Sequence, residues 1–227
     1  MKDTKHLICF DLDGVLISSM AIANQIFFDT VDEDLKLPTE EWRKNKIMMA
    51  LPAEERFDVY WKDEIKERGI TQNQIESTLN KYRKRKLRVD MPVLPNAIKS
   101  VRLMADNFEF LASVSSNKEY IIEETLEKLG IRDLFMKITG IDNIKFSKPH
   151  PEIYQTTVDY FGLHPKDAMT FEDSTHGIHS AKSAGMKAVG VATGLETIED
   201  LKKAGADIVL SNLGELDISL VYQLFSK

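Results

Sequence analysis

Two aspartates separated by a single residue, Asp11 and Asp13, follow the apolar residues 7–10 near the start of the chain. The apolar run predicts a buried strand, and Gly14 after the aspartates predicts a turn. Residues two apart on a strand lie on the same face, so both carboxylates should project together if the chain stays extended through Leu12. Carboxylates held side by side repel each other, so the pair requires a cation, a proton or both.

Polar side chains also follow later segments that we expect to be strands. They are Ser113, Ser115, Ser116 and Asn117 around the end of residues 108–114, Lys148 in the loop 146–151, and Glu172 and Asp173 after residues 168–171. Ligands of open α/β proteins bind at the carboxyl ends of parallel strands. If these segments are parallel neighbours of the first strand, two acid pairs, a hydroxyl cluster and one lysine meet at one edge of the sheet.

The charges of these side chains indicate a metal site. The ionised carboxylates of Asp11, Asp13, Glu172 and Asp173 carry −4, and Lys148 returns +1. At about 4 Å, each pair of like charges costs roughly 4 kcal/mol at an effective dielectric constant near 20. The ligands are all oxygen atoms, without a nearby histidine–cysteine set, which favours Mg²⁺ over Zn²⁺. The cation would leave a charge of about −1, so a bound phosphate dianion would need a protonated acid, and Asp13 is the candidate.

The bulk composition is that of an ordinary soluble globular chain. Of 227 residues, 43% are hydrophobic and 29% are charged, and the formal net charge is −6. This acidic balance argues against non-specific nucleic-acid binding, which needs a basic surface. The single cysteine, Cys9, excludes an intramolecular disulfide and fits a reducing compartment. No apolar run approaches the roughly 20 residues of a membrane span, and the first residues lack a signal-peptide pattern. We therefore expect a cytoplasmic monomer without membrane or nucleic-acid partners.

Residues 17–90 show helical rather than strand periodicity. Helix starts are predicted at Ser18 or Ser19, at Thr39, near Pro52 and at Thr71. The helix that begins near Pro52 is predicted to continue to Gly69. Because this stretch contains no convincing buried strand, we expect an all-helical domain inserted after the first strand.

From residue 92 onward, helical and strand patterns alternate. Strands are predicted at 108–114, 136–139, 168–171, 188–192 and 207–210, and the helices between them include 96–106, 118–129, 152–161 and 176–184. Short strands that alternate with helices imply a parallel, doubly wound sheet. The predicted fold class is therefore α/β: a doubly wound (Rossmann-like) parallel sheet core at 1–16 and 91–227, with the helical domain at 17–90.

Four motifs occur in an order and at spacings that resemble the haloacid dehalogenase-like (HAD) hydrolase superfamily. They are FDLDGVL at 10–16, LASVSSN at 111–117, SKPHPEIY at 147–154 and FEDSTHGIHSAKSAGM at 171–186. The Glu-Asp-Ser form of the last motif, and the insertion directly after the first, resemble the branch of β-phosphoglucomutases and small sugar-phosphate phosphatases. That branch carries an all-helical cap at the position of the predicted insertion.

The resemblance implies Mg²⁺-dependent hydrolysis of a small phosphorylated metabolite, such as a sugar or polyol phosphate. Asp11 would be the nucleophile that forms an aspartyl-phosphate intermediate. Asp13 would be the general acid that protonates the leaving alcohol and then the base that activates water. Ser113 and the Val114 amide would hold phosphoryl oxygens, and Lys148 would neutralise the nucleophile and the transferring group.

The resemblance also implies a set of magnesium ligands. Asp11, the backbone carbonyl of Asp13 and Asp173 would hold the ion. Glu172 would bind it either directly or through water. The second aspartate argues against carbon–halogen cleavage, because a halide leaves without a proton and true dehalogenases lack this residue.

Three alternatives stay open. Ser115 or Ser116 could hold the phosphate in place of Ser113 if the strand ends later. A phosphosugar mutase of the β-phosphoglucomutase type is the alternative function. However, the histidine of such mutases would fall near Ala23, which cannot transfer a proton.

The third alternative concerns the segment 81–88, which has six basic residues in eight and forms either a substrate entrance or a solvated helix face. Trp42 and Trp61 are predicted in the core of the helical domain.

Overall fold

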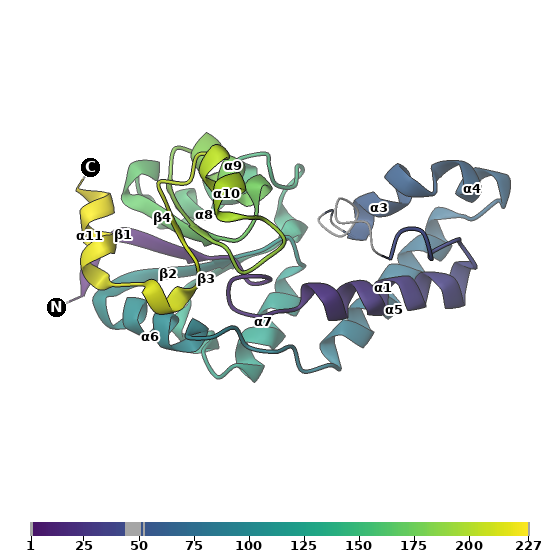
Figure 1. Ribbon diagram of the computed structural model, residues 1–227, viewed down its shortest axis with the longest axis horizontal. Helices are drawn as coiled ribbons and strands as arrows, with labels where there is room; N and C mark the ends of the chain where they lie inside the picture. The colour runs from purple at the N-terminus through teal and green to yellow at the C-terminus, as the bar shows by residue number, and fades with distance from the viewer. Residues whose placement is uncertain (1, 44–50, 52, 227) are drawn as a thin grey trace. The chain divides into compact units, whose positions relative to one another are not determined.

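The computed structural model describes residues 2–43, 51 and 53–226. The chain divides into two compact units, Met1–Ser18 with Pro92–Lys227, and Ser19–Met91 (Figure 1). The first unit contains strands and helices, whereas the described part of the second is helical. Within the described ranges, no helix is both long and apolar enough to cross a membrane.

In the described part of the chain, the first unit contains a six-stranded, wholly parallel sheet in the order β3-β2-β1-β4-β5-β6. Its strands are β1 (Asp3–Phe10), β2 (Phe108–Val114), β3 (Lys137–Thr139), β4 (Ala168–Glu172), β5 (Lys187–Val191) and β6 (Ile208–Leu210). The strand order reverses its direction between β1 and β4, as in doubly wound folds. The predicted α/β fold class is confirmed.

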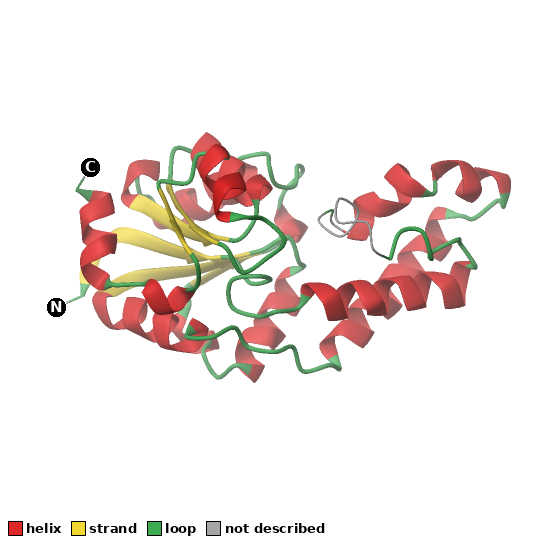
Figure 2. Cartoon of the chain, viewed as in Figure 1, coloured by secondary structure: helices red, strands yellow, loops and turns green. Residues whose placement is uncertain are grey.

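Helices lie on both faces of this sheet (Figure 2). Figure 1 shows α6 (Ala97–Asn107) and α7 (Glu119–Lys128) on one face, and α8 (Glu152–Phe161), α9 (Thr175–Ser183) and α10 (Ile198–Lys203) on the other. The described residues also form α11 (Ile218–Phe225) and four short 3₁₀ helices: η1 (Arg132–Leu134), η2 (Ile141–Asn143), η3 (Pro165–Asp167) and η4 (Leu213–Glu215). One core cluster combines strand residues such as Leu7 and Cys9 with Ile153, Ile178 and Leu201 of α8, α9 and α10.

Strand register brings the polar strand ends to one edge of the sheet. Phe10 pairs with Ser113 of β2 on one side and with Phe171 of β4 on the other. The backbone N–H of Asp11 still donates to the carbonyl of Phe171, at 3.0 Å. Asp11, directly after β1, and Glu172, the last residue of β4, therefore lie at the ends of two adjacent strands. These ends meet at the topological switch point, where doubly wound folds bind ligands.

The helical unit packs around an aromatic cluster. The helices among its described residues are α1 (Met20–Leu35), α3 (Ala53–Tyr60), α4 (Lys62–Glu67) and α5 (Gln72–Leu87). The Phe27 ring contacts the rings of Phe28, Phe57, Trp61 and Tyr82 at centroid distances of 5.5–6.3 Å. Trp61 is fully buried, which confirms its prediction as a core residue. Trp42 is partly buried against this core and packs on Tyr60 at 4.8 Å.

The prediction of one helix from Pro52 to Gly69 is wrong, because the chain breaks between α3 and α4. Trp61 leaves helical geometry at φ −129° and ψ 19°. Its ring is buried in the aromatic cluster, and its indole N–H donates to the Pro38 carbonyl at 2.9 Å. Tertiary packing of one side chain therefore overrides helix propensity here. Pro52 itself lies outside the described residues.

Other predicted helix starts have mixed outcomes. Thr71 forms a capping box with Gln74 before α5, as its position predicts. Ser19 precedes α1, but its side chain makes no capping hydrogen bond to that helix. After Thr39 the chain forms a turn, in which the Trp42 N–H donates to the Thr39 carbonyl at 3.0 Å. Residues 44–50, which follow this turn, lie outside the described residues.

We expect Phe27→Ala to destabilise the helical unit by about 3–5 kcal/mol, because a fully buried ring leaves a cavity among four aromatic neighbours. Chemical denaturation monitored by circular dichroism measures this loss. Val59→Ala is the control, since that side chain is 58% exposed. Equal stabilities of the two variants would contradict the aromatic core.

Candidate active site

Lys148 lies at the centre of the polar edge of the sheet. Its Nζ lies 2.8 Å from Asp11 Oδ1 and 2.6 Å from Glu172 Oε1. The same ammonium donates to the Val114 carbonyl at 3.3 Å. The Lys148 side chain is only 6% exposed, so these ion pairs are hardly screened by solvent. Lys148 thus links the ends of β1, β2 and β4, and its expected role in neutralising the nucleophile stays a prediction.

Three carboxylates gather around this lysine. Asp11, Glu172 and Asp173 each offer one oxygen atom, and these atoms lie within 4.8 Å of one another. All three residues are buried. If they were ionised, they would carry −3 against the single positive charge of Lys148, which is too much uncompensated charge for a buried site. The oxygen-only ligand set is suited to Mg²⁺.

The protonation behaviour of the cluster reflects this charge imbalance. Burial raises the pKa of Asp11 to about 8, against the lowering effect of Lys148 and with a further raising effect of Glu172 and Asp13. Burial also raises the pKa of Asp173 well above its usual range, and the charges of Asp11 and Glu172 add to this. Burial by itself lowers the pKa of Lys148, but Asp11 and Glu172 raise it well above the ordinary value. The lysine therefore stays charged, and Asp11 and Asp173 favour their protonated forms near neutral pH unless a cation replaces the protons.

Two glycines make room for the Asp173 carboxylate. A Cβ at Gly14 would lie 1.8 Å from Asp173 Oδ2, and a Cβ at Gly194 would lie 2.0 Å from the same atom. Gly14 also has φ +80°, which side-chain-bearing residues rarely adopt. Thr193 donates its hydroxyl to the Gly14 carbonyl and joins the two segments. Neither Thr193 nor Gly194 is predicted from the sequence, since nothing in their spacing connects them with Asp173.

The Asp13 side chain has a different environment from that of Asp11. Among the described residues, it is not part of the carboxylate group around Lys148. The chain turns at Leu12–Ile17, where the Leu16 N–H donates to the Leu12 carbonyl at 2.9 Å. The half-buried Asp13 accepts a hydrogen bond from Asn117 Nδ2 on Oδ2. The role of the Asp13 backbone carbonyl as a metal ligand stays a prediction.

The serines after β2 differ in their hydrogen bonds. Ser115 Oγ accepts from Asn117 Nδ2 at 2.9 Å and from the Asn117 backbone N–H at 3.3 Å. Ser113 is fully buried in register with Phe10, and its Oγ has no hydrogen-bond partner within the described residues. A buried hydroxyl without a partner is costly, so a bound ligand oxygen would satisfy it.

Tyr154 is a site residue that sequence reasoning missed. Its hydroxyl donates to Glu172 Oε1 and bonds Thr170 Oγ1 at 3.1 Å. Lys148 Nζ lies 5.3 Å from the centre of the Tyr154 ring. Glu172 Oε1 therefore receives both a tyrosine hydroxyl and an ammonium, which fixes its orientation. The residue belongs to the SKPHPEIY motif, but the partner of a tyrosine at the start of α8 depends on how that helix packs on the sheet.

Half of the basic side chains of the segment 81–88 form ion pairs within the helical unit. Lys81 Nζ lies 2.5 Å from Asp34 Oδ1, and Arg85 Nη2 lies 2.6 Å from Glu33 Oε2, so both join α5 to the end of α1. Arg83 is 4% exposed and pairs with Glu54 at 2.6 Å. Three of the six basic side chains of this segment are therefore paired with carboxylates of the same unit.

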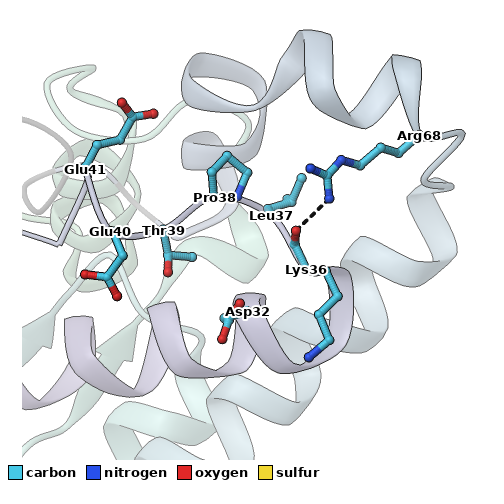
Figure 3. A pocket seen from close by; sticks show the side chains of 8 residues that line it. All are labelled: Asp32, Lys36, Leu37, Pro38, Thr39, Glu40, Glu41 and Arg68. Atoms are coloured by element: carbon cyan, nitrogen blue, oxygen red, sulfur yellow. Dashed lines mark hydrogen bonds between the residues drawn. The ribbon is translucent and has the colours of Figure 1, made fainter.

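The helical unit also contains a pocket of about 520 Å³ near the end of α1. Its lining consists of Asp32, Lys36, Leu37, Pro38, Thr39, Glu40, Glu41 and Arg68 (Figure 3). Arg68 Nη1 donates to the Lys36 carbonyl at 2.6 Å, a hydrogen bond that joins two residues of this lining (Figure 3). The lining includes none of the predicted site residues, and its mixed charges favour no single ligand.

We expect Mg²⁺ to raise the melting temperature of the protein, because it replaces protons on the buried carboxylates. At a hundredfold excess over Kd, the stabilisation would be about 2.7 kcal/mol. The raised pKa of Asp11, about 8, means that the metal-free folded state binds more protons than the unfolded state at pH 6. Its stability therefore falls as the pH rises from 6 towards 8, and the Mg²⁺-induced shift grows over the same range.

Thermal unfolding with Mg²⁺ or EDTA at each pH measures this effect. Asp173→Asn should remove the shift, since it deletes one charged ligand without changing shape. Glu109→Gln, at an exposed position of β2, should retain it. An unchanged shift in Asp173→Asn would exclude this metal site.

Comparison with known proteins agrees with this geometry. The family model described as haloacid dehalogenase-like hydrolase matches residues 8–191. Hexitol phosphatase B of Escherichia coli is 25% identical over 91% of this chain and 92% of its own length. The β-phosphoglucomutase of Bacillus subtilis is 29% identical over 95% and 93%. A solved structure of a haloacid dehalogenase-like hydrolase from Streptococcus pneumoniae superimposes with a TM-score of 0.75 at 19% identity, covering 96% of this chain and 98% of that one. The chain belongs to the haloacid dehalogenase-like hydrolases.

Proposed function

We propose that this protein is a Mg²⁺-dependent phosphatase that hydrolyses a small phosphorylated metabolite through an aspartyl-phosphate on Asp11. One observation carries the proposal: Lys148 bridges Asp11 and Glu172 inside a buried carboxylate cluster at the carboxyl ends of β1 and β4. An ammonium in this position neutralises both a carboxylate nucleophile and the phosphoryl group that it receives. Family membership and the phosphatase names of relatives support the same reaction class.

Asp11 is suited to nucleophilic attack. Lys148 bonds its Oδ1, which leaves Oδ2 as the attacking oxygen. This oxygen forms a bond to phosphorus while the bond from phosphorus to the alcohol oxygen breaks, and the alcohol oxygen keeps the electron pair. The Asp13 carboxyl gives its proton to that oxygen, so a neutral alcohol leaves.

The second half-reaction restores the enzyme. A water oxygen attacks phosphorus and passes its proton to the Asp13 carboxylate. The bond from phosphorus to Asp11 breaks, and its electron pair returns to the Asp11 carboxylate. The sum is one phosphate ester and one water converted into one alcohol and one inorganic phosphate, with both aspartates in their starting states.

The remaining site residues bind rather than react. Asp11, Asp173 and the Asp13 backbone carbonyl would hold Mg²⁺, which neutralises negative charge on the phosphoryl oxygens when bound. Glu172 Oε1 is already bonded by Lys148 and Tyr154, which favours a contact with the metal through water over direct ligation. The unpartnered Ser113 hydroxyl favours Ser113 over Ser115 as the phosphate-binding serine. The Val114 amide would complete this part of the site.

A sugar or polyol phosphate is the substrate class that we propose. Hexitol phosphatase B supports it by name, and residues 19–91 would act as the substrate-selecting cap that the family resemblance implies. The phosphosugar mutase is the second candidate, because a relative is named β-phosphoglucomutase. The sequence places the buried Ala23 near the position of the mutase histidine, which favours hydrolysis.

We expect release of inorganic phosphate from a panel of sugar and polyol phosphates, with activity lost in EDTA and restored by Mg²⁺. Asp11→Asn should lower kcat by at least about a thousandfold, because a neutral amide cannot form the phosphoenzyme. Phosphate release measured in a coupled assay tests both expectations. Asp133→Asn, on η1, should retain activity.

The same panel separates the two candidate functions. Conversion of a hexose 1-phosphate into its 6-phosphate with little free phosphate would identify a mutase. Turnover that survives EDTA, or full activity in Asp11→Asn, would contradict both candidates.

A further inference from the structure

We propose that Asn117 is a positioning residue that orients the Asp13 carboxyl for proton transfer. This inference rests on the proposed function, because it assumes that Asp13 acts as general acid and base. It concerns a residue that no step of that mechanism uses.

The side-chain amide of Asn117 connects the two loops that follow β1 and β2. Its Nδ2 donates to Asp13 Oδ2 across 104 positions of sequence. The same nitrogen donates to Ser115 Oγ at 2.9 Å. One amide group thus joins the Asp13 carboxyl to the loop that carries the hydroxyl cluster.

The backbone of Asn117 is itself held in place. Its carbonyl accepts the N–H of Ile141 at 3.0 Å, and the preceding Ser115 N–H donates to the Thr139 carbonyl at 3.1 Å. A Cβ at Gly140 would lie 2.5 Å from the Asn117 carbonyl oxygen, so glycine allows this close approach. The loop is therefore tied to the end of β3, and Asn117 presents its amide from a fixed backbone.

This geometry gives the two oxygens of Asp13 different roles. An amide N–H is a donor only, so Oδ2 must act as an acceptor while the bond is present. In this proposal, Oδ1 is then the oxygen that carries the proton and transfers it to the leaving group. Loss of the Asn117 hydrogen bond would weaken the hold on this carboxyl, so the proton would spend less time in a productive position.

Leaving-group chemistry separates this role from a merely structural one. An alkoxide is a strong base and needs a proton as it departs, whereas p-nitrophenolate departs readily without one. A defect in the positioning of the general acid should therefore lower kcat/KM for alkyl phosphates more than for p-nitrophenyl phosphate. A general loss of folding or of phosphate binding would affect both esters equally.

The test compares kcat/KM for β-glycerol phosphate and p-nitrophenyl phosphate. Asn117→Ala should lower the value for the alkyl ester by about tenfold to a hundredfold, with a change of less than about threefold for the aryl ester. Asn117→Asp keeps the shape, removes the N–H donor, and should show the same selectivity. Asn107→Ala is the matched control, because its amide donates to the Leu103 carbonyl at 2.8 Å at the amino end of β2.

Asp13→Asn separates the outcomes. If it loses alkyl ester turnover selectively, Asp13 is the general acid, and Asn117→Ala added to it should cause no further selective loss. Equal losses on both esters in both Asn117 variants, or alkyl turnover unchanged in them, would overturn the positioning role while the proposed function stands. If Asp13→Asn shows no selective loss, the acid role in the proposed function fails instead, whatever the Asn117 variants do.

Discussion

The ion pairs of Lys148 are the interaction on which the rest of the site depends. A buried ammonium bonds the Asp11 and Glu172 carboxylates at 2.8 and 2.6 Å, so it joins two neighbouring strand ends. Removing one member of such a buried group leaves uncompensated charge and costs several kilocalories per mole. The surplus of carboxylates over cations is what calls for a divalent metal. That surplus also marks the cluster as a chemical site rather than a structural ion pair.

Several residues from separate parts of the sequence support this charge arrangement. The buried Tyr154, from α8, donates a hydrogen bond to the Glu172 carboxylate and fixes its orientation. Gly14 and Gly194 leave space for Asp173, where any side chain would collide with its carboxylate. The parallel sheet places all of these groups at one edge, because its strand order changes direction between β1 and β4. The charged groups are therefore concentrated at the topological switch point of the sheet.

Sequence reasoning predicted the parts of the fold that local patterns determine. The strand at 108–114 and the helix at 152–161 occur at those residues, because apolar periodicity is strong there. The helix break at Trp61 was beyond such reasoning, since it follows from burial of one ring against residues far along the chain. Lys148 beside Asp11 could be expected from strand ends and motifs. The contacts of Tyr154 and Asn117 could not, because they depend on how a helix and a loop pack on the sheet.

Mass spectrometry of the enzyme quenched with acid during turnover tests the central claim most directly. A substrate phosphate in excess with Mg²⁺ should leave a phosphoryl group on the peptide that contains Asp11, and borohydride should reduce that residue to homoserine. Neither the phosphoryl group nor the homoserine should be found in the Asp11→Asn variant. A labelled residue other than Asp11, or rapid turnover without any covalent phosphoenzyme, would contradict the account.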